Sequence, residues 1–233
     1  MTTADGWVAA VRSRTGLGVL LPLGGPEDGA WIAARAVDAA LRGAARQVEG
    51  VTPGRVRITP AGAPHGTRSA GAPDGRPSAF PAPPGSLPPG PLRIEMDFAA
   101  GTAVPLPALA DRLRAALWAA SERRLGLIVS EVDLRVTDLA DGAPREAVDT
   151  APPAAPPREA GPGSLDDPVA GAAAGVEGVD RLTTVLGPPV HRAADHVRVE
   201  LATAPDHRPL DVARAVRGAV REQLPVTVVV TGA

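Results

Sequence analysis

The sequence predicts an α/β fold of the two-layer α+β type, built from two repeated small modules. Each module is expected to combine a helix with a βαβ unit on a short mixed sheet. Three observations predict this. A strand–helix–strand pattern covers residues 92–139, a shortened form of it recurs before the C-terminus, and disordered segments rich in proline and glycine interrupt and separate the two copies.

The pattern over residues 92–139 begins with a strand that has one apolar and one charged face. Pro105 then suits the start of a helix, because the N–H group that proline lacks has no partner in the first turn. Gly126 is placed to end the helix in the left-handed conformation, and an alternating run at 132–136 closes the unit, which favours parallel strands joined by a right-handed crossover. The first strand alternates Leu92, Ile94, Met96 and Phe98 with Arg93, Glu95 and Asp97.

The second copy is indicated by residues that recur in the same order. Upstream of the strands, Val48-Glu49-Gly50-Val51 is echoed by Val176-Glu177-Gly178-Val179. In the strands and the crossover helix, Arg198-Val199-Glu200 echoes Arg93-Ile94-Glu95, Pro209-Leu210 echoes Pro105-Leu106, and Val226, Val228 and Val230 fall on Val132, Leu134 and Val136.

The remaining elements follow from caps and periodicity. Asp28 is a good N-cap for a helix from about Ala30 to Gln47, and Val56 and Ile58 suggest a short strand after it. In the second copy we expect a weak helix over 167–175 with Ser164 and Asp166 as capping candidates. A possible strand at Leu182, Val185 and Leu186 ends at Pro188-Pro189, a strand follows over 197–201, a helix over 209–224, and a last strand over 226–231.

Two segments have too few large apolar side chains to offset the cost of ordering them, roughly 1–2 kcal/mol per residue for the backbone. They are residues 60–91 and 140–164, both rich in Pro, Gly and Ala. We therefore predict an N-terminal arm over 1–27, a first module over 28–139 with a disordered insertion at 60–91, a Pro/Ala-rich linker over 140–164, and a second, shortened module over 165–233.

Composition narrows the classes of function. All 24 basic residues are arginine, a bias typical of a GC-rich bacterial genome, and the net charge of −2 argues against a dedicated nucleic-acid binder. Cysteine is absent, which excludes disulfides and thiolate metal sites. No apolar run approaches the roughly 20 residues that span a bilayer, and the first residues lack the apolar h-region of a signal peptide. We expect a cytoplasmic protein, with peripheral attachment to the inner face of the membrane as an option.

The search for chemistry identifies no catalytic, cofactor-binding or metal-binding residue, so we expect no cofactor and no small-molecule substrate. Glycines between Gly16 and Gly25 superficially suggest a phosphate cradle, but the Lys-Ser ending and the preceding strand are missing. His191 and His196 are five residues apart among loop-forming residues, and with His207 they are interpreted as solvated rather than as metal ligands.

Residues 29–58 joined to 92–139 resemble the alkaline shock protein family of bacterial cell-envelope stress proteins. The resemblance depends on the helix ending at Val48-Glu49-Gly50-Val51, the helix opened by Pro105, and the closing run from Leu125 to Val136, an aliphatic-Gly-aliphatic turn before a valine-rich strand. Residues 168–231 resemble a second, degenerate copy. The chain departs from the family pattern after its first strand, where Ala99-Ala100-Gly101 replaces a glycine beside an aromatic residue.

The resemblance implies a non-enzymatic interaction or scaffold protein that self-associates or docks to a membrane-anchored protein partner during cell-envelope stress. It implies no catalytic residues. Two alternatives stay open at this point: a small α/β nucleic-acid-binding module, and an enzyme with an unrecognised site near His191–His207.

Overall fold

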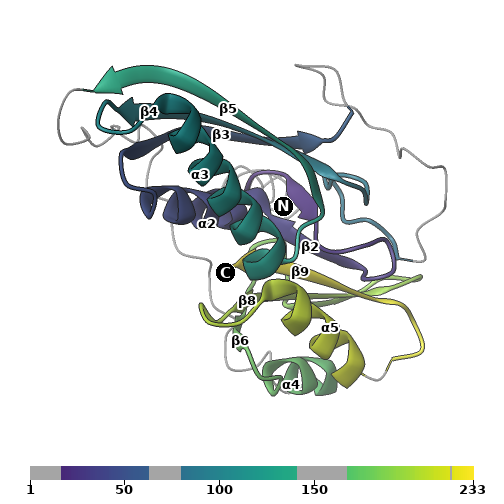
Figure 1. Ribbon diagram of the computed structural model, residues 1–233. Helices are drawn as coiled ribbons and strands as arrows, with labels where there is room; N and C mark the ends of the chain where they lie inside the picture. The colour runs from purple at the N-terminus through teal and green to yellow at the C-terminus, as the bar shows by residue number, and fades with distance from the viewer. Residues whose placement is uncertain (1–16, 63–79, 141–166, 221) are drawn as a thin grey trace, which may run out of the picture.

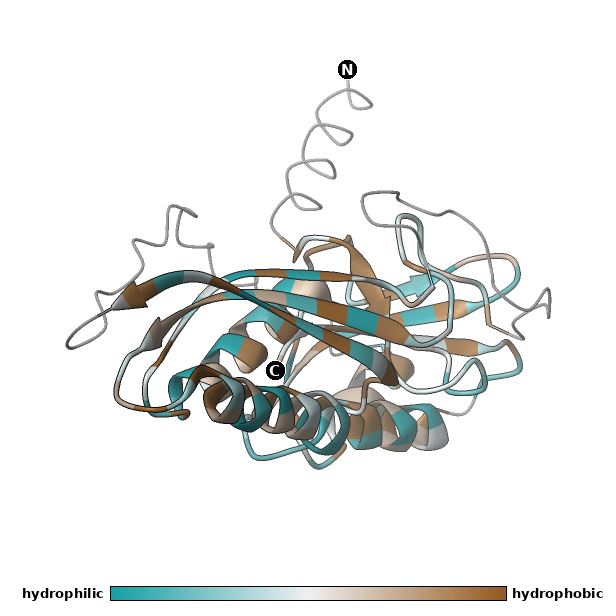
Figure 2. Ribbon diagram, turned by 45° about the horizontal axis from the view of Figure 1, so that its top comes forward, coloured by the Kyte–Doolittle hydropathy of each residue, from teal (hydrophilic) through white to brown (hydrophobic). Residues whose placement is uncertain are grey.

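The computed structural model describes residues 17–62, 80–140, 167–220 and 222–233, and it shows a mixed α+β protein with two mixed sheets (Figure 1). Strands form one layer and helices the other (Figure 2). The first 16 residues of the predicted N-terminal arm and the linker over 140–164, except its first residue, lie outside the described residues.

The first module contains a three-stranded sheet in the order β3-β4-β5. β3 runs antiparallel to β4, and β4 runs parallel to β5, as the strand–helix–strand pattern predicted. Helices α2 and α3 cover one face of this sheet (Figure 1). Its elements are α2 (Ala34–Arg46), β3 (Val51–Pro60), β4 (Leu92–Gly101), α3 (Leu106–Ala119), the π-helical turn η1 (Ala120–Leu125) and β5 (Val129–Ala140).

The second module supplies most of a six-stranded sheet in the order β1-β2-β9-β8-β6, with β7 also paired to β8. β6 and β7 are antiparallel to β8, and β8 is parallel to β9. The elements are α4 (Pro168–Ala174), β6 (Val179–Leu182), β7 (Val190–Arg192), β8 (Val197–Thr203), α5 (Pro209–Ala219) and β9 (Val226–Gly232), joined by β1 (Leu20–Pro22) and β2 (Ala30–Ala33).

Apart from the additional strand β7 in the second, both modules have the element order helix, strand, strand, helix, strand, with the same sense of pairing between corresponding strands. Their registers differ. Ile94 lies opposite Val132, whereas Val199 lies opposite Val228, two residues beyond the partner that the sequence match assigns. That the modules are repeats of one unit stays a prediction.

The helix predicted from Ala30 to Gln47 begins later, at Ala34, and residues 30–33 form strand β2 instead. Asp28 is therefore not its N-cap; Ala33 occupies that position without a side-chain hydrogen bond. The reason is tertiary: β2 pairs in parallel with Val228–Val230 of β9, and β1 pairs with β2. Residues on both sides of the predicted boundary at 27 thus belong to the sheet of the second module.

Three boundaries in the second module also differ from the predictions. The N-cap of α4 is Asp167, whose Oδ1 accepts from the Val169 N–H at 2.9 Å; Ser164 and Asp166 lie outside the described residues. β6 ends at Leu182, before Val185 and Leu186, and β7 follows the two prolines. α5 ends at Ala219 rather than Leu224, because Val220 is already extended.

Part of the insertion predicted to be disordered is ordered. In residues 80–91, the Leu87 N–H donates to the Leu20 carbonyl at 2.8 Å, and Trp31 Nε1 donates to the Leu87 carbonyl at 3.4 Å. The Arg217 guanidinium lies 4.2 Å from the centre of the Phe80 ring. The few apolar side chains of this segment thus pack against the edge of the six-stranded sheet. Residues 63–79 lie outside the described part of the chain.

The two modules share one hydrophobic core. The apolar face of β4 packs under α3, whose Leu109, Leu113 and Leu117 are fully buried, and the same cluster continues into Val216 of α5 and the valines of β8 and β9. Because the cluster is continuous, we expect both modules to unfold in a single transition.

Leu113→Asp and Val216→Asp should each unfold the protein or strongly lower its melting temperature. Each loses roughly 1.5–3 kcal/mol of apolar burial and adds a buried unpaired charge, against a total stability of roughly 5–15 kcal/mol. Circular dichroism melts measure the effect. Leu106→Asp, at a position 38% exposed in the first turn of α3, is the control that should leave the melt nearly unchanged. An unshifted melt in either core variant would contradict the assignment of the core.

Candidate functional site

The outer face of the three-stranded sheet, opposite α2 and α3, carries many charged side chains. Along β4, buried residues alternate with partly exposed ones, because one face is covered by helices. Figure 2 shows the alternation as bands of both colours along these strands. The outer face carries four arginines and four carboxylates: Arg55, Arg57, Arg93 and Arg135 with Glu95, Asp97, Glu131 and Asp133.

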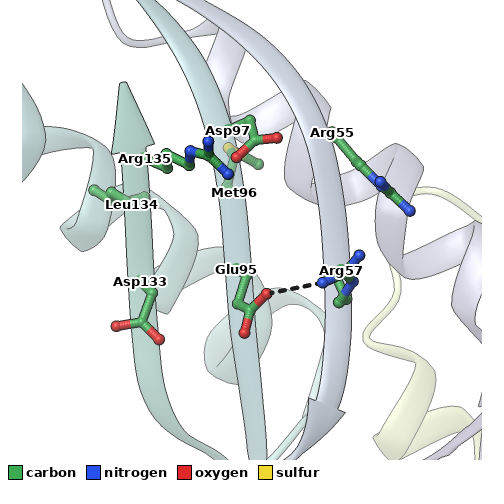
Figure 3. Close-up of a pocket in the computed structure, with 8 residues that line it drawn as sticks. All are labelled: Arg55, Arg57, Glu95, Met96, Asp97, Asp133, Leu134 and Arg135. Carbon is green, nitrogen blue, oxygen red and sulfur yellow. Dashed lines mark ion pairs between the residues drawn. The ribbon is translucent and has the colours of Figure 1, made fainter. Parts of the chain in front are cut away.

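Arg93 organises the charges at one end of this face. Its Nε donates to Asp133 Oδ2 at 2.6 Å, and its Nη1 lies 3.2 Å from Glu131 Oε2, so it joins β4 to β5. Only 16% of its side chain is exposed. Arg57 on β3 lies 3.6 Å from Glu95 on β4 (Figure 3). Exposed pairs of this kind contribute roughly 0–1 kcal/mol each, so they orient the side chains more than they stabilise the sheet.

The other end of the face carries charges without such partners. Arg55, Asp97 and Arg135 make no ion pair with any of the residues that the structure describes. They surround a shallow hollow of about 320 Å³, which Figure 3 shows over the three strands. Its lining combines both signs of charge: Arg55, Arg57, Glu95, Met96, Asp97, Asp133, Leu134 and Arg135.

One edge of the same sheet is open. β5 pairs with β4 along one side, and no described strand pairs with its other side. The edge continues into exposed apolar side chains at both ends, since Ile128 is 44% exposed and Leu139 is 60% exposed. A charged face next to an unpaired strand edge offers both side-chain and backbone groups to a partner.

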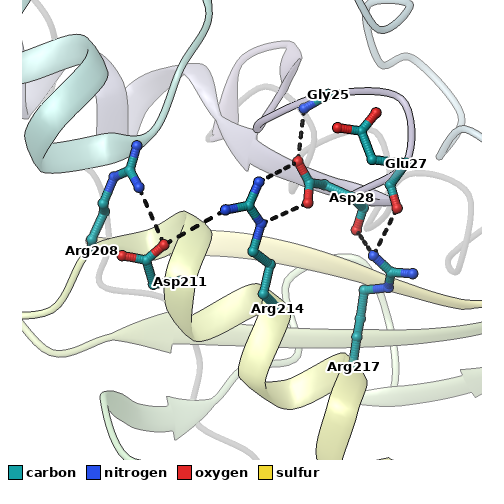
Figure 4. A network of polar contacts seen from close by, with 7 residues as sticks. All are labelled: Gly25, Glu27, Asp28, Arg208, Asp211, Arg214 and Arg217. Carbon is teal, nitrogen blue, oxygen red and sulfur yellow. Dashed lines mark hydrogen bonds and ion pairs between the residues drawn. The ribbon is translucent and has the colours of Figure 1, made fainter.

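A second polar cluster joins the two modules and has a structural role (Figure 4). Asp28 is buried, with 4% of its surface exposed, in the loop between β1 and β2. Arg214 of α5 binds it with two hydrogen bonds, of 2.7 Å to Oδ1 and 3.1 Å to Oδ2, and the Gly25 N–H donates to Oδ2 at 2.8 Å. Arg217 donates to the Glu27 carbonyl at 2.9 Å.

This cluster shifts the ionisation of Asp28. Burial by itself would raise the pKa of the carboxyl, but hydrogen bonds from Arg214 and Gly25 and the charges of Arg214 and Arg217 outweigh it. The pKa of Asp28 is therefore lowered from its ordinary value of 3.8. The loop is held on α5 at neutral pH by an ionised, fully hydrogen-bonded carboxylate.

Gly126 shows how closely the modules approach here. It ends η1 in the left-handed conformation with φ of 93°, as the sequence predicted, and its carbonyl accepts from the Gly24 N–H at 3.1 Å. A Cβ atom at this position would lie 2.4 Å from Cβ of Leu210 in α5. Glycine is required both by the backbone conformation and by the contact.

Glu200 is the second buried carboxylate, fully enclosed in β8. It accepts hydrogen bonds from the Thr183 hydroxyl at 2.9 Å and from the Leu186 N–H at 2.9 Å, and also from the Val185 N–H. Burial raises the pKa of Glu200 above its ordinary value, and these hydrogen bonds oppose the rise. The Glu200 carboxylate caps the loop after β6, because it accepts hydrogen bonds from backbone N–H groups that have no partner in a strand.

The histidines of the alternative enzyme site are not brought together. His191 lies on β7 opposite Arg198, and His196 contacts Asp195 at 2.7 Å just before β8. His207 follows β8, a seven-residue strand that is roughly 23 Å long at about 3.3 Å per residue. His207 instead lies 3.8 Å from Glu177. No group of three or more His, Asp or Glu side chains is placed to hold a metal in the described part of the chain.

Sequence reasoning predicted no site residues and missed this face. The alternation in β4 and β5 indicated which side chains point outward, but the sequence does not reveal which of them find partners across strands. Asp28 was assigned to a helix cap, and Glu200 was matched to Glu95, whose side chain is partly exposed. The burial of Glu200 depends on the loop over 183–187, which no pattern near β8 indicates.

No family model matches this sequence, and comparison with curated proteins and with solved structures finds no similar chain. The resemblance to alkaline shock proteins therefore stays a prediction. None of the helices in the described residues is long and apolar enough to cross a membrane.

Asp28→Asn should lower the free energy of unfolding at pH 7 by about 2 kcal/mol, the usual contribution of hydrogen bonds to a charged group. Because the pKa is depressed in the folded state, the wild-type advantage is full above the ordinary value of 3.8 and is lost as the pH falls below it. Urea unfolding at pH 7 and at pH 3 measures the loss of stability and its dependence on pH. The control is Asp111→Asn, which removes the carboxylate of an exposed pair with Arg114. A pH-independent difference would contradict the ionised pair.

Proposed function

We propose that this protein is a non-enzymatic interaction or scaffold protein, of the kind that the resemblance to alkaline shock proteins implies. It acts by self-association or by docking to a membrane-anchored protein. The partner contacts the outer face and open edge of the β3-β4-β5 sheet. The observation that carries this proposal is the presence of unpaired charges of both signs beside a strand edge that lacks a partner.

The balance of charge on this face favours a protein partner. A surface that binds phosphate backbones gathers cations of one sign, often with aromatic side chains for stacking. Here four arginines are interleaved with four carboxylates, and the lining of the hollow contains no aromatic side chain. Interleaved charges match the mixed surface of a folded protein, and they select its orientation more than they add affinity.

The shape of the face supports the same conclusion. Its hollow lies over three strands and is lined by long side chains rather than enclosed by walls (Figure 3). Small-molecule sites are usually concave and mostly apolar, with a few convergent polar groups. A shallow, charged surface on a rigid sheet is suited to contact with another macromolecule.

Reversal of charge on β3 tests the proposal away from the open edge. Arg55→Glu combined with Arg57→Glu should reduce binding to inner-membrane vesicles of the source cells at least about tenfold, because it removes one ion pair and places like charges near Glu95 and Asp97. The matched control is Arg112→Glu on the exposed side of α3. Cosedimentation of the purified full chain measures binding, and sedimentation velocity measures self-association in parallel.

Vesicles treated with protease distinguish the kind of partner. A membrane-anchored protein partner predicts binding that is lost after proteolysis, together with sensitivity to the β3 variant. The proposal is contradicted if the chain neither self-associates nor binds vesicles in a protease-sensitive way, or if the β3 variant binds like the control. Salt-sensitive binding to duplex DNA with neither of these properties would favour the nucleic-acid alternative instead.

A further inference from the structure

The strand edges of this protein differ in how well they are protected against pairing with another chain. Exposed edges are usually short, interrupted by proline or bulges, or blocked by charges that point inward. In the six-stranded sheet, β1 has three residues and contains Pro22, β6 has four residues and β7 has three. β3, one edge of the three-stranded sheet, contains Pro53 and Pro60 and has a bulge before Val56.

β5 is less protected along its free side, because its two bulges, at Ser130 and Thr137, leave residues 131–136 regularly paired with β4. It is 12 residues long, from Val129 to Ala140, without proline or glycine. Its inward-facing side chains are aliphatic rather than charged: Val132, Leu134 and Val136. Leu134 and Val136 are only partly buried, because no strand covers their outer side. The open, regular part of this edge, residues 131–136, is therefore apolar on its inner face.

The side chains of β5 are self-complementary in one antiparallel register. If two copies pair about Leu134, each Asp133 lies opposite the Arg135 of the other copy, and Val132 lies opposite Val136 on the inner face. Pairing about Asp133 or about Arg135 would place like charges opposite each other. A shift by a single residue would set charged side chains of one copy against the apolar face of the other.

Arg135 supports this register, because it makes no ion pair with the described residues of its own chain. Asp133 binds Arg93 through Oδ2, and half of its side chain remains exposed, at 51%. Across the two-fold axis each Asp133 would thus join Arg93 of its own copy to Arg135 of the other. The contact would extend the ion-pair network that already joins β4 to β5.

We propose that two copies of this chain associate through antiparallel pairing of their β5 strands about Leu134, so that two three-stranded sheets continue as one. The inference rests on the self-association branch of the proposed function and names its partner and its surface. The interface is isologous, since the same strand is used by both copies, and it closes with two-fold symmetry.

A charge swap tests the pairing. Asp133→Arg and Arg135→Asp each replace two opposite-charge pairs with two like-charge pairs across the axis. Each variant should therefore weaken self-association at least about tenfold. An equimolar mixture of the two variants restores opposite charges at both positions, so it should recover dimers of wild-type mass. Sedimentation velocity of the full chain over a concentration series measures the masses.

Thr137 provides a second test that does not disturb Arg93. In the proposed register it lies opposite Glu131, so Thr137→Arg should strengthen the dimer and Thr137→Glu should weaken it. Arg112→Glu, on the exposed side of α3, is the control that should leave the dimer constant unchanged. Circular dichroism verifies that each variant is folded.

The outcomes separate this inference from the proposed function. The pairing is overturned if the wild type stays monomeric at high concentration, if the swapped mixture fails to recover dimers while Thr137→Arg has no effect, or if Arg112→Glu weakens the dimer as much as Arg135→Asp. If the wild type is monomeric but its protease-sensitive binding to vesicles still depends on Arg55 and Arg57, the proposed function stands without β5 pairing. If the wild type is monomeric and also shows no protease-sensitive binding to vesicles that depends on Arg55 and Arg57, both proposals are wrong.

Discussion

Backbone pairing between β2 and β9 is the interaction on which the rest of this structure depends. β9 is rich in valine and buried on both faces, with Val228, Val229 and Val230 fully enclosed, so it needs a partner strand on each side. β8 supplies one, and β2, which leads directly into the first helix of the other module, supplies the second. The modules cannot separate without exposing β9. The Asp28–Arg214 contact and the left-handed turn at Gly126 then fix how closely they pack.

The same pairing determines which surfaces remain available. It uses the start of the first module to complete the six-stranded sheet, where short strands occupy both edges, and it leaves the three-stranded sheet with β5 exposed (Figure 1). The helices cover one face of that sheet, so the charged face and the β5 edge are what it presents to partners. The proposed function and the proposed self-association follow from this division: the buried carboxylate of Asp28 joins the modules, while the exposed charges are left to contact other chains.

The sequence predicted the parts of this arrangement that local patterns determine. The alternation from Leu92 to Phe98, the helix after Pro105, the cap at Gly126 and the parallel pairing of β4 with β5 are all confirmed, because each depends on residues close together in the chain. The wrong predictions concern segments whose structure depends on residues far away in the sequence. Residues 30–33 fit a helical stripe as well as a strand, and only the distant valines of β9 decide between them. Glu200 fits an exposed position in the alternation, but the loop that carries Thr183 and Leu186 encloses it. The alternation indicates that the candidate face points outward. It does not indicate which arginines on that face lack an ion pair, since ion pairs across strands depend on register.

The most direct test of the open edge is hydrogen exchange at the amides of β5 in the wild-type protein, measured at low and high protein concentration. Pairing of two copies places part of these amides in new backbone hydrogen bonds, so their exchange should slow as concentration rises. The amides of β3, at the other edge of the same sheet, should exchange at the same rate throughout. Exchange in β5 that does not depend on concentration, or slowing that is equal in β3 and β5, would contradict the account.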